Sequence, residues 1–185
     1  LLADRFFFED SGGGITLSGG EPLAQPAFAA EVLRLCREAG VHTALETTLG
    51  VSREAVKAVL PHTDRFLVDQ KIASPEAHKQ ILSVDLDKVR ANLEFLLSGG
   101  ADVLLRIALI PGFTALDENI RDLGTYIAGL EPQPPVELLN FNPLAENKYR
   151  MLERRWPISR ETRRYTPEEI DHFAEILTDA GVKRI

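Results

Sequence analysis

The sequence contains very little cysteine: a single residue, Cys36, among 185. One thiol excludes an internal disulfide and a metal site built only from cysteines, and it fits a reducing, cytoplasmic setting. Basic residues are also in the minority, with 21 Lys and Arg against 28 Asp and Glu and a formal charge of −7. Because nucleic acid binding needs clustered cations, this balance predicts a protein that binds no nucleic acid.

Long hydrophobic runs and common site motifs are missing as well. No stretch approaches the roughly 18 apolar residues of a membrane span, so we expect no membrane insertion. The four histidines show no HExxH spacing, and we expect no metal ligands among the residues of this chain. Neither GxxxxGK[ST] nor GxGxxG occurs, which argues against a phosphate-binding barrel enzyme.

What the sequence does contain is a regular alternation of apolar runs of strand length with segments of helical period. Strands are expected at 14–18, 41–47, 65–71, 103–110 and 136–141, with a weak sixth at 182–185. Helices are expected at 24–39, 53–60, 116–130 and 167–180, with a pair over 75–97. Only 145–166, which is polar and basic, breaks the pattern.

The alternation predicts an α/β fold with a parallel sheet. The run VLLRIALI at 103–110 is nearly all apolar, as expected of a strand buried on both faces. The fold is either a barrel of the TIM kind, complete or partial, or a doubly wound sheet. Five or six strands are too few for a closed eight-stranded barrel.

Polar side chains cluster where the expected strands end, which is where parallel α/β folds carry their functional residues. Arg106 is the strongest single clue, because an unpaired charge within an apolar strand costs several kcal/mol. It is either in a structural ion pair with Asp69 or Glu46, or it faces a ligand. Asp69 and Lys71 lie two positions apart and therefore on the same side of their strand, where they could also simply neutralise each other.

The glycines after the first expected strand allow close backbone approach to a ligand. Glu21 makes the Gly19–Glu21 turn a poor anion site and a reasonable ammonium site, because carbonyls and carboxylates both accept protons. The strand ends together offer two cations and three carboxylates, a mixture suited to a ligand with both an ammonium and a carboxylate. One interpretation is therefore an α/β binding module, without a metal cluster or redox chemistry, for an amino acid-like ligand or peptide.

Five stretches, in this order, carry a more specific pattern: SGGGITLSGGEPLAQ at 11–25, ETT at 46–48, DQK at 69–71, LLRIALIPGFT at 104–114 and LLNFNPLAENKY at 138–149. Together they resemble the glycyl radical enzyme activating enzymes of the radical S-adenosylmethionine (SAM) superfamily. The resemblance covers nearly the whole chain. It implies a partial parallel (β/α)6 barrel of the TIM kind and an oxidoreductase that activates a partner of the pyruvate formate-lyase kind.

The resemblance also implies roles for the first two strand ends. Gly19, Gly20 and Glu21 match the motif that holds the methionyl ammonium of SAM. Glu46 and Thr47 match a pair near the methionyl carboxylate, where the family can bind a monovalent cation.

For the other strands, the resemblance implies that Asp69 and Lys71 are catalytic residues near the cofactor and the target peptide. Arg106 matches an arginine that contacts the cofactor. Asn142 falls where some members have a histidine beside the adenine, which is a departure from the family pattern.

The resemblance further implies a 4Fe-4S cluster on a CxxxCxxC loop and an electron donor such as flavodoxin or ferredoxin. The cluster's electron would cleave SAM, and the resulting radical would remove hydrogen from a glycine of the partner. This sequence has no such loop, and Leu1 is not an initiator methionine. We therefore expect residues 1–185 to be one domain, the C-terminal part of a radical SAM barrel without its first strand and cluster loop. Alone, it is expected to be inactive.

Overall fold

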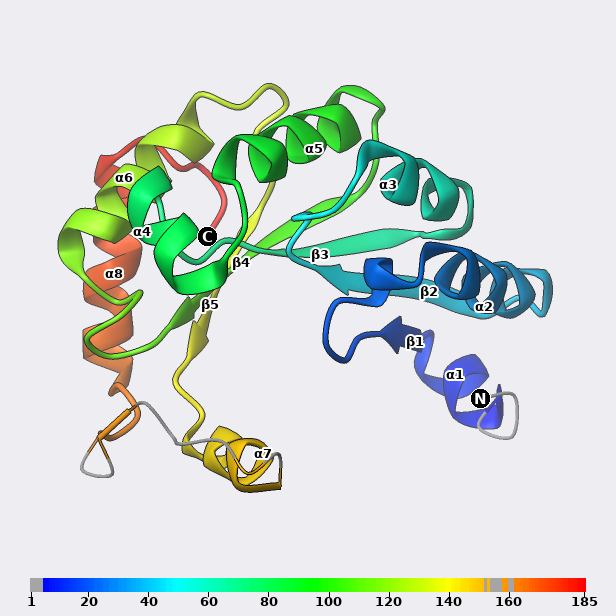
Figure 1. Cartoon of the computed structure of the whole chain (residues 1–185), viewed down its shortest axis with the longest axis horizontal. Helices are drawn as coiled ribbons and strands as arrows, with labels where there is room; N and C mark the ends of the chain where they lie inside the picture. Colours follow the sequence, from blue (N-terminus) through cyan, green and yellow to red (C-terminus); the bar gives the residue numbers. More distant parts are fainter. Residues whose placement is uncertain (1–4, 152, 154–157, 160–161) are drawn as a thin grey trace.

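Five short strands pair in the order in which they occur along the chain (Figure 1). The computed structural model describes residues 5–151, 153, 158–159 and 162–185. Among these residues all neighbouring strands are parallel, and their sequential order has no point of reversal. This is the winding of a barrel and not of a doubly wound sheet. The strands are β1 (Gly14–Leu17), β2 (His42–Thr47), β3 (Arg65–Asp69), β4 (Val103–Leu109) and β5 (Val136–Asn140).

Helices follow the strands and form an arc around the outer side of the curved sheet (Figure 1). Short α1 and α7 lie near the open side of this arc. The helices are α1 (Arg5–Ser11), α2 (Pro26–Glu38), α3 (Arg53–Val59), α4 (Pro75–Leu82), α5 (Leu86–Ser98), α6 (Asp117–Ala128), α7 (Glu146–Met151) and α8 (Pro167–Asp179), with 3-10 turns at Pro22–Ala24, Leu60–His62 and Pro143–Ala145.

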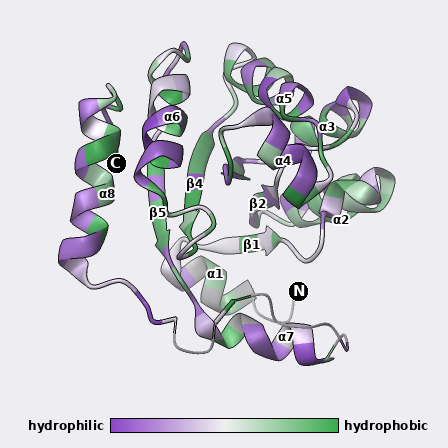
Figure 2. Ribbon diagram, turned by 60° about the vertical axis from the view of Figure 1, so that its left-hand side comes forward, coloured by the Kyte–Doolittle hydropathy of each residue, from purple (hydrophilic) through white to green (hydrophobic). Residues whose placement is uncertain are grey.

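The hydrophobic core lies between the outer face of the sheet and the helices. Phe66, Leu105 and Ile107 are fully buried there, and β4 is green along much of its length in Figure 2. Burial along β4 alternates, so that Leu104 and Arg106 on the inner face are only half-buried. The expectation that this strand is buried on both faces is therefore wrong, because in the described part of the chain the helices pack against one face of the sheet.

Most of the expected elements are present, with local differences at their ends. The helix expected at 24–39 starts at Pro26, after the turn Pro22–Ala24, since proline suits the first helical position. The helix pair over 75–97 is divided at Ser83, whose φ is 57°. In the described chain, 182–185 form no strand; the Arg184 carbonyl only accepts one bond, from Val136 N. The expected sixth strand is thus wrong.

None of the helices in the described part of the chain combines the length and the apolar character needed to cross a membrane. The segment expected to be irregular, 145–166, contains α7 and in part lies outside the described residues.

Candidate functional site

A charged cluster joins three neighbouring strands on the inner face of the sheet. Arg106 Nη2 lies 2.9 Å from Asp69 Oδ1 and 2.8 Å from Glu46 Oε1. Lys71 Nζ lies 3.3 Å from Asp69 Oδ2. Asp69 and Arg106 are direct partners in the β3–β4 register, which explains why they meet. Arg106 thus forms an ion pair with both of the carboxylates that the sequence suggested.

Burial and the neighbouring charges shift the pKa of Arg106 in opposite directions. Its side chain is only 13% exposed, and burial alone lowers the pKa of a cation. The hydrogen bonds and charge of Asp69, with the charge of Glu46, outweigh this effect, so the pKa of Arg106 is raised above its usual value. The guanidinium is therefore charged at every pH at which the protein folds, and its two carboxylate partners compensate for the loss of water.

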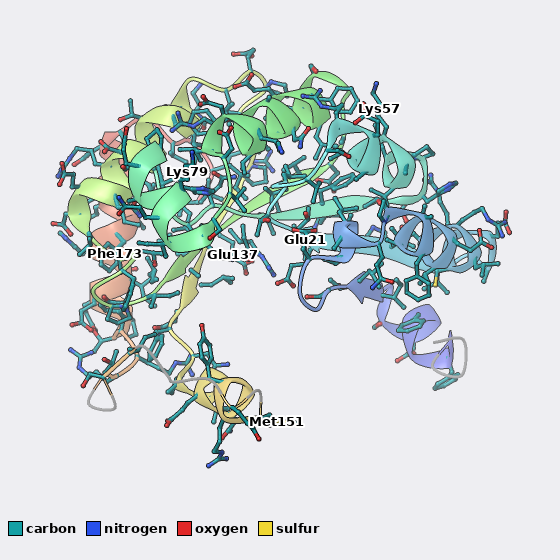
Figure 3. The ribbon with its side chains drawn as sticks, in the orientation of Figure 1. Glu21, Lys57, Lys79, Glu137, Met151 and Phe173 are labelled. Atoms are coloured by element: carbon teal, nitrogen blue, oxygen red, sulfur yellow. The ribbon has the colours of Figure 1, made fainter. Side chains whose placement is uncertain are left out.

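A second cluster surrounds Glu21, in the turn between β1 and α2 (Figure 3). Oε1 of Glu21 accepts hydrogen bonds from Thr47 Oγ1 at 2.8 Å and from Leu23 N at 3.1 Å. Oε2 accepts from the backbone N and from Oγ1 of Thr48, both at 2.9 Å. The carboxylate therefore ties the turn after β1 to the end of β2.

Gly19 and Gly20 are exposed and directly precede Glu21 in the sequence. The φ of Gly19 is 138°, a conformation that residues with a side chain rarely adopt. A Cβ built at either glycine would meet no atom within 4 Å. The two peptide groups therefore border open space, in which their carbonyls could accept hydrogen bonds from a bound ammonium group.

Asn142 lies apart from these clusters. It follows β5, whereas the Glu21 turn follows β1, and these two strands are the opposite edges of the sheet. The Asn142 side chain is exposed, and its Oδ1 accepts a hydrogen bond from Leu144 N at 3.1 Å. It caps its own turn, and its predicted contact with adenine stays a prediction.

Two residues that the sequence interpretation missed support the strand ends. Thr48 contributes two of the four bonds to Glu21. Asn92 on α5 is 2% exposed and donates to the backbone of the loop after β2. A signal for Asn92 was available, because it interrupts the apolar face formed by Val89, Leu93 and Leu96.

Cys36 lies on α2 with 4% exposure in the hydrophobic core. Its thiol is thus remote from solvent. In the part of the chain that the structure describes, His, Cys, Asp and Glu side chains do not gather in groups of three or more that could hold a metal ion.

The arrangement can bind a ligand of mixed charge. Backbone carbonyls at Gly19 and Gly20 offer acceptors for a cation. The side chains of Glu46, Asp69, Lys71 and Arg106 sum to zero charge, so a ligand carboxylate bound here would share Arg106 or Lys71 with the protein carboxylates.

Comparison with known proteins points to one family. The model of the Radical SAM superfamily matches residues 2–124. The (2S)-3-sulfopropanediol dehydratase activating enzyme of Klebsiella oxytoca is 35% identical over 98% of this chain and 59% of its own length. The pyruvate formate-lyase-activating enzyme of Clostridium pasteurianum is 37% identical over 82% of this chain and 63% of its own length.

A solved structure of similar fold points to the same family. A domain of a pyruvate-formate lyase-activating enzyme from Bacteroides vulgatus superposes with a TM-score of 0.73 at 28% identity, covering 94% of this chain and 98% of that one. The chain spans 59% to 63% of the length of the curated relatives named above. These matches do not favour a cluster-free binding module.

Proposed function

The chain belongs to the radical SAM superfamily, and from this premise we propose that it acts in the activation of a glycyl radical enzyme. The observation that carries the proposal is the position of the two clusters. The Gly19–Glu21 turn and the ion pairs of Arg106 occupy the carboxyl ends of consecutive parallel strands, where barrels of this kind bind their ligands. The names of the relatives support the type of partner.

The residues at the strand ends fit SAM. We propose that the Gly19–Glu21 turn receives its ammonium group and that Arg106 and Lys71 attract its carboxylate. The open space beside both glycines and the positive φ of Gly19 support this assignment. When bound, the cofactor would supply the radical for hydrogen abstraction. The monovalent cation implied beside Glu46 and Thr47 would compete with Arg106, which already lies 2.8 Å from Glu46.

The residues present do not fit a 4Fe-4S cluster. Three thiolates would be required, whereas the sequence has one cysteine, and that residue is buried in the core. The proposal for these 185 residues is that they form one domain, the part of the barrel that binds and orients the cofactor.

We propose Asp69 and Lys71 as the catalytic pair of this chain. Asp69 lies on the less buried face of β3, Lys71 follows it by two residues, and both side chains are partly exposed, so a segment of the partner can approach them. Their ion pair holds Lys71 in place beside Arg106. A flavodoxin or ferredoxin as electron donor and a cytoplasmic setting belong to the same proposal, on the basis of the resemblance and the single cysteine.

Two experiments test the proposal. Calorimetric titration of the 185-residue protein with SAM, methionine and adenosine should show binding of SAM that is tighter than binding of either half. Tighter binding of free amino acids would instead favour a binding module. In a hybrid, these residues replace the matching part of the Clostridium pasteurianum relative, which is then reduced and mixed with pyruvate formate-lyase. We expect a glycyl radical signal by electron paramagnetic resonance; a folded hybrid that binds SAM without producing the signal would contradict activation.

A further inference from the structure

The loop after β2 contains an unfavourable backbone conformation. Leu49 has a φ of 59°, although it is not glycine, and it is fully buried. Leucine rarely adopts this left-handed region, and such residues persist only where their surroundings hold them. Neighbouring Gly50 is also restricted, since a Cβ there would lie 2.5 Å from Val84 Cγ1.

Asn92 holds this loop from the outer layer of helices. Its Nδ2 donates to the carbonyls of Leu49 at 3.0 Å and Val51 at 2.9 Å. Arg53 Nε donates to Asn92 Oδ1 at 2.7 Å, and the Arg53 guanidinium stacks 4.3 Å from the centre of the Phe95 ring. Both N–H groups of the buried Asn92 amide are therefore donated to the loop, and its oxygen accepts from Arg53. These bonds fix the orientation of the amide.

The same loop holds the turn after β1. Thr48 precedes Leu49 and donates both its N–H and its hydroxyl to Oε2 of Glu21. Thr47 and Leu23 donate to Oε1. Four donors thus surround the two oxygens, and all of them belong to the protein. A carboxylate engaged in this way is better suited to fixing the turn than to receiving a ligand.

We propose that Asn92, Thr48 and Glu21 are positioning residues. Asn92 on α5 is hydrogen-bonded to the loop after β2, and Thr48 of that loop is hydrogen-bonded to Glu21, which directly follows Gly19 and Gly20 in the turn. Glu21 acts on the ammonium group through the backbone of the glycines and does not contact it. The part of this inference that concerns SAM rests on the proposed function, whereas the effect on the turn is a property of the protein without ligand.

Hydrogen exchange of the ligand-free protein tests the chain of bonds directly. Thr48→Val removes the hydroxyl bond while keeping the size of the side chain, and Asn92→Ala removes both bonds to the loop. Each should speed exchange in the peptide covering 18–24 by about tenfold or more, since a hydrogen bond to a charged group is lost or weakened. Thr48→Ser, which keeps the hydroxyl, should restore slow exchange. Unchanged exchange at 18–24 in Thr48→Val would overturn the inference.

A matched control separates positioning from general destabilisation. Thr63 is buried near the opposite end of the sheet and donates to the Val59 carbonyl at 2.9 Å. Thr63→Val should lower the unfolding temperature as Thr48→Val does, yet leave exchange at 18–24 unchanged. Faster exchange at 18–24 in Thr63→Val would show that any loss of stability loosens the turn, and would overturn the specific role.

Titration with two ligands tests the role of Glu21. Glu21→Gln should weaken binding of SAM and of its analogue lacking the amino group by the same factor, because the defect lies in the turn. A loss confined to SAM would show direct contact with the ammonium and would overturn this part of the inference. If the wild-type protein bound no SAM, the proposed function would fail, while the exchange results would still decide whether the three residues fix the turn.

Discussion

Arg106 on β4 and Asp69 on the adjacent strand β3 are register partners, with Nη2 and Oδ1 2.9 Å apart, and Oε1 of Glu46 on β2 lies 2.8 Å from the same nitrogen. The guanidinium therefore spans three strands at the end where the glycine turn lies. An arginine bound in this way can hold two carboxylates apart and still present its remaining N–H groups to a ligand.

The first prediction is that Arg106→Ala weakens SAM binding by about 10- to 100-fold, the effect of losing about 1.5–3 kcal/mol from a hydrogen bond to a charged group. The measurement is calorimetric titration. Arg65→Ala is the control, because Arg65 forms an exposed ion pair with Asp102 at the start of β3 and should not affect the ligand. Equal affinity of Arg106→Ala and the wild type would mean that Arg106 serves only as an ion pair.

The second prediction concerns the glycine turn. Gly20→Ala should leave the free energy of unfolding within about 0.5 kcal/mol of the wild type, because the new Cβ meets no atom within 4 Å. The same methyl group would project into the space that the ligand needs and should weaken SAM binding. Urea unfolding and titration measure the two effects separately. Wild-type affinity in Gly20→Ala would show that the ligand does not approach this peptide.

Much of the site could be predicted because it follows from strand order. In a parallel sheet, the ends of consecutive strands lie together, so the polar residues that follow 14–18 and those at the ends of 41–47 and 65–71 were expected to lie close to one another. Arg106 in an apolar strand needed an anion, and Asp69 and Glu46 were the candidates on the neighbouring strands. The structure brings these three together as an ion-pair cluster.

The engagement of Glu21 could not be predicted, because it depends on the shape of two loops and not on periodicity. The left-handed Leu49 has no sequence signal, since leucine is normally excluded from that conformation. The prediction of a sixth strand at 182–185 was wrong. The segment VKRI at 182–185 has an apolar residue at each end. In the described structure it accepts one backbone hydrogen bond, from Val136 N to Arg184 O, and does not form a strand.

The third prediction is that the 185-residue protein assembles no stable 4Fe-4S cluster when it is treated anaerobically with iron and sulfide. Cys36 supplies one thiol, which is buried among core residues of α2. We expect no cluster absorbance in the visible range beyond that of a Cys36→Ala control. Absorbance that appears in the wild type, persists after desalting and is lost in Cys36→Ala would contradict the prediction.

The fourth prediction concerns acid stability at the start of α8. Glu169 closes the capping box of Thr166 and pairs with Arg163, with Oε2 and Nη1 2.6 Å apart. The hydrogen bond from Arg163, and then that from the Thr166 backbone, lower the pKa of Glu169 from 4.5 to about 2. A carboxyl whose pKa is lowered by folding stabilises the protein above its unfolded pKa, and this contribution is lost as the pH falls through the folded pKa.

The stability difference between wild type and Glu169→Gln should therefore be constant above pH 5 and shrink as the pH falls from about 4.5 toward 2. Urea midpoints at a series of pH values measure it. Arg163→Gln should produce the same pattern, and the double variant should add little, because both substitutions remove one interaction. A difference that stays constant down to the lowest pH at which the protein folds would mean that the ion pair contributes nothing to stability in solution, as is common for exposed pairs.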